Sequence, residues 1–219
     1  VINIRHVPLT NVFNATVKRC VDIFGALFGI TLFSPLMLIT AALIKITSPG
    51  PVIYSQERIG LHNRPFKMFK FRSMEVQDPN KEKKQWTTPH DPRVTPVGRF
   101  IRKTSIDEMP QFFNILIGDM SLVGPRPERP EIAALYSERI PEFDYRLKVK
   151  AGLTGYAQVY GKYNTTPYDK LTMDLMYIAH PSIIEDLKIM FATVKILFMP
   201  ESTEGVSEGQ TTAMSGENN

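Results

Sequence analysis

Two adjacent carboxylates, Asp107 and Glu108, form the pattern in this sequence best suited to chemistry, within the run SIDEMP at residues 105–110. Proline is tolerated in the first turn of a helix, so Pro110 predicts that a helix begins here with Ser105 or Asp107 as its N-cap. Neighbouring side chains on a helix point about 100° apart, so one carboxylate could attack a substrate while the other holds a cation. Ser105 and Glu108 also match a capping box, which leaves a purely structural role open for the acids.

Basic residues just before this pair indicate an anionic substrate. Arg99, Arg102 and Lys103 lie at i, i+3 and i+4 of a short helix predicted over residues 96–103, and therefore share one face. Positive charge and a helix N-terminus both attract phosphate, whereas two carboxylates repel it. A bridging Mg²⁺ removes this repulsion, so the pattern predicts magnesium-assisted chemistry on a phosphate group.

A second motif, GPRP at residues 124–127, places Arg126 between two prolines. Both prolines have a fixed φ, and each disfavours a helical conformation in the residue before it. A guanidinium on such a stiff, extended segment could bind phosphate through two hydrogen bonds at a small cost in entropy. A rigid turn with an incidental arginine explains the motif equally well.

The longest apolar run covers residues 23–44, IFGALFGITLFSPLMLITAALI, and contains 22 residues without a charge. At about 1.5 Å per residue, a helix of this length measures about 33 Å and could cross the hydrocarbon core of a bilayer. The pair Ser34-Pro35 interrupts the run, because Pro35 has no N–H to donate to the carbonyl of Thr31. The hydroxyls of Ser34 and Thr31 are well placed to satisfy that carbonyl.

The charges beside this run favour a re-entrant helix over a spanning one. Lys18 and Arg19 precede the run, and Lys45 follows it. Positive charge at both ends favours keeping both ends on the cytoplasmic side, which a helix that breaks at Ser34-Pro35 and returns would achieve. A buried core helix is the alternative, but so long an uncharged run is unusual in soluble domains.

Composition narrows the class of protein and of partner. The 219 residues carry a net charge of +4, and the segment 45–103 holds 13 basic and 5 acidic residues. Such a basic segment predicts a polyanionic partner, namely anionic lipid, substrate phosphate or nucleic acid. The segment contains no recognisable nucleic-acid-binding motif. Alternatively, these basic residues form a surface that is exposed to solvent and binds no partner. A single cysteine excludes a disulfide framework and a multi-cysteine zinc site, and the four histidines have no metal-ligand spacing.

The remaining patterns predict an α+β fold that is mostly helical with a small antiparallel sheet. Residues 52–58 and 66–74 read as a hairpin around a turn that contains Asn63, and residues 150–162 as loop or short strand. We expect a helix over 130–146 with a break near Pro141, and an amphipathic helix over 183–198 that packs on the domain rather than lying in the membrane interface.

Taken together, these motifs resemble the bacterial sugar transferase family, the monotopic polyprenyl-phosphate phosphoglycosyl transferases, over about residues 18–198. The resemblance rests on KRCVDIFGALFGITLFSPLMLI, QERIGLHNRPFKMFKFRSM, DPRVTPVGRFIRKTSIDEMPQFFNILIGDMSLVGPRPE, GLTGYAQVYGKY and DLMYIAHPSIIEDLKIM. It implies a re-entrant membrane helix broken at Ser34-Pro35 and a cytosolic catalytic part. It also implies that Asp107 is the nucleophile, Glu108 the Mg²⁺ ligand and the Pro-Arg-Pro motif a phosphate-binding element. Asn63 stands where the family often has glycine, and asparagine is the next most tolerant residue in a left-handed turn.

From the resemblance we expect transfer of a sugar 1-phosphate from a nucleoside-diphosphate sugar, here a UDP-sugar, to polyprenyl phosphate such as undecaprenyl phosphate. This would start exopolysaccharide, capsule or other glycan synthesis through a covalent Asp-phosphosugar intermediate. Membrane lipids are expected partners, nucleic acid is not, and a homo-oligomer is left open. The rival hypothesis is a non-catalytic membrane-surface scaffold or polyanion-binding protein. The candidate substrate- or phosphate-binding residues are Arg126, Arg102, Arg99, Lys70, Arg72 and Gln111.

The expected organisation has four parts. Residues 1–17 are an N-terminal extension, 18–48 the membrane helix, 49–200 the catalytic domain on the cytoplasmic face, and 201–219 a disordered acidic tail. The first residue is Val1 rather than methionine, and the N-terminal stretch resembles the linker after extra membrane helices in longer relatives. We therefore expect a piece of a longer protein.

Overall fold

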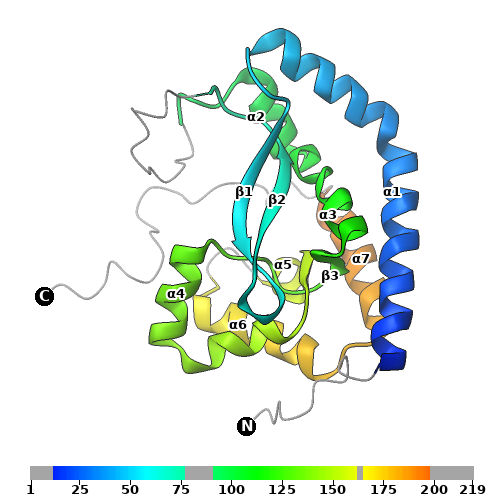
Figure 1. Cartoon of the computed structure of the whole chain (residues 1–219), viewed down its shortest axis with the longest axis vertical. Helices are drawn as coiled ribbons and strands as arrows, with labels where there is room; N and C mark the ends of the chain where they lie inside the picture. The colour runs from blue at the N-terminus through cyan, green and yellow to red at the C-terminus, as the bar shows by residue number, and fades with distance from the viewer. Residues whose placement is uncertain (1–11, 77–90, 162–164, 198–219) are drawn as a thin grey trace, which may run out of the picture.

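A computed structural model describes residues 12–76, 91–161 and 165–197 of the chain. One long helix, α1 (Val12–Thr47), runs along the side of a domain made of shorter helices and two small sheets (Figure 1). The mostly helical α+β fold expected from the sequence is confirmed. Residues 1–11 of the expected extension, residues 77–90 and the expected acidic tail lie outside the described residues, whereas residues 12–17 already belong to α1.

Helix α1 continues through Pro35 and is not divided into two helices. The Ser34 hydroxyl donates to the carbonyl oxygen of Thr31 at 2.9 Å, the acceptor that Pro35 leaves without its main-chain donor. This confirms the predicted role of Ser34, whereas the Thr31 hydroxyl donates to the carbonyl of Leu27 and takes no part. In Figure 1 the C-terminal part of α1 bends towards α2 (Pro96–Lys103). The helix is long and apolar enough to cross a membrane, and less than a quarter of its most apolar window is buried in the protein.

The predicted hairpin is confirmed. Strands β1 (Ile53–Ile59) and β2 (Pro65–Phe71) pair antiparallel, in a register that runs from Ile53 opposite Phe71 to Ile59 opposite Pro65. Between them Asn63 has a φ of 59°, the left-handed conformation for which asparagine is suited.

A second pair of strands was not predicted as such. Strand β3 (Met120–Val123) lies parallel to β4 (Ala151–Thr154), and all four residues of β3 are buried. The backbones of Gly124, just after β3, and Gly152, in β4, approach each other closely, since a Cβ on Gly152 would lie 2.1 Å from the nitrogen of Gly124. Only glycine fits there, and the contact fixes where the chain leaves β3 towards Arg126.

The helices around these strands have the following bounds: α2 (Pro96–Lys103), η3 (Ile106–Glu108), α3 (Gln111–Ile117), α4 (Pro130–Arg139), η4 (Pro141–Lys148), α5 (Tyr156–Tyr160), α6 (Pro167–Ala179) and α7 (Ile183–Leu197). The predicted break at Pro141 is confirmed, because α4 ends at Arg139 and the 3₁₀ helix η4 begins at Pro141. The main core includes the fully buried side chains of Ile115, Met120, Ile178 and Ile189.

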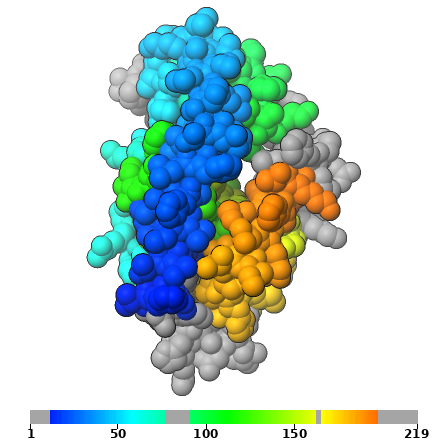
Figure 2. Space-filling model, turned by 90° about the vertical axis from the view of Figure 1, so that its right-hand side faces the viewer, coloured from blue at the N-terminus to red at the C-terminus, as the bar shows by residue number. Residues whose placement is uncertain are grey.

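Helix α7 has one buried and one exposed apolar face. Asp186 and Ile189 are buried against the domain, which agrees with the predicted packing. The outward side chains are Ile184, Leu187, Phe191 and Val194. Figure 2 shows α7, in orange, on the same face of the molecule as α1, in blue. Exposed apolar surface of both helices is therefore presented on one side.

Candidate active site

Asp107 and Glu108 lie in a single 3₁₀ turn, η3, between α2 and α3. A helix does begin here with Ser105 in the N-cap position, but it is the 3₁₀ turn η3, and the side chain of Ser105 makes no capping hydrogen bond in the described structure. The α-helix α3 begins only at Gln111, directly after Pro110. Proline cannot donate a main-chain hydrogen bond, so Pro110 takes the position before the helix. Ser105, just before the two acids, has a φ of 55° and is in the left-handed conformation. The capping-box alternative is thereby removed.

Two cations bind one oxygen of Glu108. Lys70 Nζ, from β2, donates to Glu108 Oε1 at 2.7 Å, and Arg126 donates to the same oxygen at 2.8 Å. Burial alone would raise the pKa of Glu108, but the charges of Arg126 and Lys70 outweigh it and lower the pKa to about 2. Glu108 is therefore a fixed anion at neutral pH. Its other oxygen, Oε2, accepts no hydrogen bond from any residue that the structure describes.

Asp107 has the opposite environment. Its residue surface is 8% exposed, and within residues 12–76, 91–161 and 165–197 its carboxylate takes part in no hydrogen bond or ion pair. Burial raises the pKa of Asp107 to about 6, against the lowering effect of the nearby charge of Lys70 and Arg102. An ionised carboxylate without a hydrogen-bond partner is a good nucleophile, because no bond must be broken before it attacks.

The GPRP segment is held in place by the second sheet. The Gly124 N–H donates to the carbonyl of Thr154, and the Gly152 N–H donates to the carbonyl of Pro125, both at 2.9 Å. The β3–β4 pairing thus extends into the motif. It holds the segment that carries Arg126 in a fixed position beside Glu108.

Two arginines that the sequence patterns did not single out hold the rest of the motif. Arg146 donates to the carbonyl of Arg126 at 2.9 Å, and Arg58 donates to the carbonyl of Pro127 at 3.1 Å. Arg146 is itself bound to the buried carboxylate of Asp174 at 2.8 Å. Because the main chain of the motif is bound on both sides, the guanidinium of Arg126, with a side chain 47% exposed, is offered to solvent at a defined position.

Sequence spacing gave little sign of these supporting residues. Arg58 lies in a β-strand, Arg146 in a 3₁₀ helix and Asp174 in an α-helix, and each pattern alone predicts only a solvated charge. An aspartate at a position of α6 that should face the core is the one signal that could have indicated a buried ion pair. A shallow pocket beside the motif is lined by Gly60, Pro125, Arg126, Pro127, Glu128 and Arg146, among others.

The other predicted binding residues lie at different distances from the two carboxylates. Arg102 is close enough for its charge to act on Asp107, and Gln111 is buried at the start of α3. Arg99 is exposed on α2, and no contact joins it to the carboxylates. Arg72 serves a structural purpose instead, since its guanidinium is buried and donates to the carbonyls of Ser48 and Pro49 after α1. We therefore do not include Arg72 in the site.

A family model for the bacterial sugar transferases matches residues 13–200, which is most of the chain. The chain belongs to the bacterial sugar transferase family. The match contains α1 except for its first residue, both carboxylates and the GPRP motif in one continuous stretch. The resemblance inferred from the sequence motifs is thereby confirmed.

Three curated relatives illustrate the range of this sugar transferase family. The chain is 46% identical over 186 residues to the UDP-N-acetylgalactosamine-undecaprenyl-phosphate N-acetylgalactosaminephosphotransferase of Aeromonas hydrophila, covering 84% of this chain and 44% of that protein. It is 44% identical over 192 residues to the UDP-glucose:undecaprenyl-phosphate glucose-1-phosphate transferase of Escherichia coli, covering 85% and 41%. It is 38% identical over 185 residues to the exopolysaccharide production protein PSS of Rhizobium leguminosarum, covering 81% and 92%. The chain thus spans less than half the length of the first two relatives.

The two carboxylates of the site fit the magnesium ion that the sequence motifs predict. Mg²⁺ in proteins takes one or two carboxylate ligands together with water and substrate phosphate oxygens. Glu108 Oε2 and the Asp107 carboxylate are oxygens free of other partners in the described part of the chain, while Glu108 Oε1 is kept in place by Lys70 and Arg126. Within that part no group of three or more metal-binding side chains occurs, so substrate phosphates would have to supply further ligands.

Proposed function

We propose that the chain transfers a sugar 1-phosphate from a UDP-sugar to undecaprenyl phosphate, the first step of a lipid-linked glycan. The observation that carries the proposal is Asp107, a buried carboxylate without a hydrogen-bond partner in the described structure, next to a cation-bound carboxylate and a rigid arginine. The names of the relatives in Aeromonas hydrophila and Escherichia coli supply the class of donor and acceptor.

The proposed reaction has two displacements. A carboxylate oxygen of Asp107 attacks the β-phosphorus of the UDP-sugar, and the bond from that phosphorus to the oxygen bridging the phosphates breaks, so that UMP leaves. The sugar phosphate is then an acyl phosphate on Asp107. A phosphate oxygen of undecaprenyl phosphate attacks the same phosphorus, and the carboxylate of Asp107 leaves. An ionised carboxylate needs no general base for this chemistry.

The neighbouring residues bind and orient the donor. Arg126, fixed by its carbonyl bond to Arg146, would bind phosphate oxygens that carry negative charge. Glu108 would hold Mg²⁺, which when bound neutralises charge on the diphosphate, and Asp107 would stay free to attack. Because Asp107 is largely buried, water has little access to the acyl phosphate, which protects it from hydrolysis.

We also propose that α1 enters and leaves the membrane on one side, the cytoplasmic side. The two ends of α1 bind the same domain: Arg19 donates to the carbonyls of Ile115 and Leu116 at the end of α3, and Arg72 donates to the carbonyl of Ser48. A domain cannot lie on both faces of a bilayer, so these contacts support the re-entrant arrangement. The exposed apolar face of α7, beside α1 in Figure 2, supports a shallow membrane contact as well.

The decisive experiment is an assay of the purified chain with undecaprenyl phosphate, Mg²⁺ and a panel of UDP-sugars, in which release of UMP is measured. We expect turnover with at least one sugar, and with a radioactive donor we expect labelled protein when the lipid acceptor is left out. The Asp107→Asn variant should give neither. If it still trapped labelled phosphosugar, Asp107 would not be the nucleophile. If no donor released UMP with the wild-type chain, the non-catalytic scaffold would be the better description. If initial rates required both substrates to be bound together, a single direct displacement would replace the covalent scheme.

A further inference from the structure

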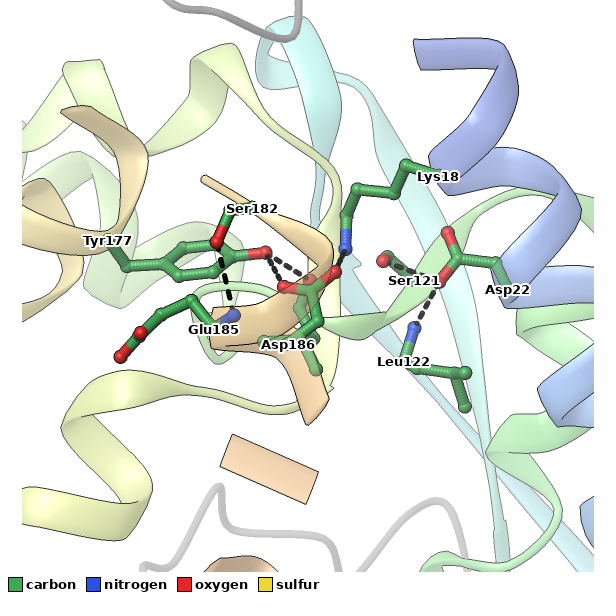
Figure 3. Close-up of polar contacts among 9 residues, drawn as sticks. Lys18, Asp22, Ser121, Leu122, Tyr177, Ser182, Glu185 and Asp186 are labelled. Carbon is green, nitrogen blue, oxygen red and sulfur yellow. Dashed lines mark hydrogen bonds and ion pairs between the residues drawn. The ribbon is translucent and has the colours of Figure 1, made fainter. Parts of the chain in front are cut away.

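The membrane helix is joined to the strand that precedes Arg126. Asp22, in the part of α1 that lies against the domain, is only 2% exposed. Its Oδ1 accepts two hydrogen bonds, one from the Ser121 hydroxyl and one from the main-chain N–H of Leu122, both at 2.9 Å (Figure 3). Ser121 and Leu122 belong to β3, and β3 leads directly into the GPRP segment that carries Arg126.

A second link connects α1 to the end of the same strand. Lys18 Nζ donates to Asp186 Oδ2 on α7 at 2.6 Å, and the hydroxyl of Tyr177 donates to Asp186 Oδ1 at 2.7 Å (Figure 3). The same hydroxyl lies 3.3 Å from the carbonyl oxygen of Val123, the last residue of β3. One turn of α1 is therefore linked to β3 at two places, directly through Asp22 and indirectly through Lys18.

These contacts do more than anchor the helix. A buried carboxylate is stable only when it is hydrogen-bonded, and Asp22 obtains both of its hydrogen bonds from β3. Packing between the elements is already close, since a Cβ on Gly25 would lie 2.4 Å from the side chain of Leu122. What Asp22 adds is an acceptor for a main-chain N–H of β3, and therefore control over the position of that strand.

We propose that Asp22 is a positioning residue, which through β3 fixes the position of Arg126 beside Glu108. Full activity then requires that the membrane helix is correctly packed against the domain. The proposal rests on the proposed function for its kinetic consequence but not for its structural one. A shift of β3 would move the GPRP segment relative to η3 and so disturb the bond between Arg126 and Glu108 at 2.8 Å.

The choice of variants separates positioning from charge. Asp22→Asn keeps an oxygen that can accept both hydrogen bonds, whereas Asp22→Leu has a similar size and accepts none. Thr40→Val is the matched control on the same helix, since Thr40 is also buried but its hydroxyl donates only to Leu36 within α1. An orphaned main-chain donor costs enough to displace the strand, so we expect kcat of Asp22→Leu to fall roughly ten- to a hundred-fold, with a smaller change in KM for the UDP-sugar. Asp22→Asn and Thr40→Val should stay within about threefold of the wild-type kcat.

Hydrogen–deuterium exchange of the full chain in lipid nanodiscs gives a readout that needs no activity. We expect faster exchange in peptides covering residues 120–127 for Asp22→Leu, and wild-type exchange for Asp22→Asn and Thr40→Val. If Asp22→Leu does not fold, Ser121→Ala removes one of the two bonds and should give a smaller change of the same kind.

Three results would overturn the proposal. They are wild-type kcat in Asp22→Leu, a loss in Asp22→Asn as large as in Asp22→Leu, and faster exchange spread over the whole domain instead of residues 120–127. If the wild-type chain turned over no UDP-sugar, the proposed function would fail, while the exchange experiment would still test whether Asp22 holds β3.

Discussion

Asp107 and Glu108 are neighbours in one 3₁₀ turn, yet their pKa values are shifted in opposite directions. Burial raises the pKa of Asp107 to about 6. Burial acts on Glu108 in the same sense, but there the charges of Arg126 and Lys70 prevail and lower the pKa to about 2. Among the described residues, cations lie within hydrogen-bond distance of Glu108 but not of Asp107. This division matches a nucleophile beside a fixed, ion-holding carboxylate.

Asp107→Asn should remove activity and increase stability. The pKa of Asp107 is higher in the folded chain than its ordinary 3.8, so the folded state binds more protons between pH 4 and 6. The free energy of unfolding therefore falls as pH rises through this window, by about 2–3 kcal/mol. The asparagine variant lacks this loss. Its stability advantage should be absent near pH 3, grow between pH 4 and 6, and be constant above pH 7.

Thermal unfolding in detergent with EDTA, at a series of pH values, measures this difference without bound metal. Glu142→Gln is the control, because Glu142 is exposed on η4 and should show no such pH-dependent gain. A variant less stable than the wild-type chain at pH 7 would mean that Asp107 is held by favourable contacts and is not a strained nucleophile.

Glu108→Gln should change the requirement for magnesium more than the chemistry. The amide keeps an oxygen at the site but loses the negative charge that binds Mg²⁺, and it leaves Lys70 and Arg126 without their shared anion. We expect the Mg²⁺ concentration for half-maximal rate to rise roughly tenfold or more. Titration of UMP release with Mg²⁺ measures this, and an unchanged titration curve would exclude Glu108 as a ligand.

Arg126→Lys should lose most of the activity with little loss of stability. Lysine keeps the charge but has no planar pair of donors, so it cannot bind phosphate and Glu108 in the same geometry. We expect a fall in kcat/KM of roughly a hundredfold, and a melting temperature close to that of the wild-type chain. Arg139→Lys, on the exposed end of α4, is the matched control. Near-normal turnover of Arg126→Lys would reduce Arg126 to a point charge in a turn.

The ion pair between Arg146 and Asp174 should be far more important to stability than the one between Lys188 and Glu185. Both partners of the first pair are buried, so Arg146→Met leaves an unpaired buried carboxylate at a cost of about 3–5 kcal/mol. Lys188 is exposed, and Lys188→Met should cost less than about 1 kcal/mol. Denaturant unfolding of the two variants compares them directly. Equal losses would show that Asp174 finds another partner.

The topology of α1 can be tested by cysteine labelling in a Cys20→Ser background, which removes the single cysteine. Val12→Cys places a thiol at the exposed start of the described helix, and Lys170→Cys places one on the exposed surface of α6. We expect an impermeant reagent to label both from the same side of sealed membrane vesicles, because both ends of α1 bind one domain. Labelling from opposite sides would mean that α1 spans the membrane.

Much of the local structure could be predicted from the sequence because it depends on near neighbours. The β1–β2 hairpin follows from two β-prone runs around a turn, and Asn63 is in the left-handed conformation expected of it. The bond from Ser34 to the Thr31 carbonyl was also predicted, since donor and acceptor are three residues apart on one helix. The helix start after Ser105 was right only for a 3₁₀ turn, because Ser105 is left-handed and its side chain makes no capping bond, which the capping pattern does not reveal.

The sequence by itself determined which residues could do chemistry, namely Asp107, Glu108 and Arg126, and that an apolar helix precedes them. Only the tertiary structure decided how these residues differ. The bond between Arg126 and Glu108, the support from Arg146 and the link from Asp22 to β3 all join segments distant in sequence. Burial and charge at a site depend on every element packed around it, and a pattern of spacings along one chain segment does not contain that information.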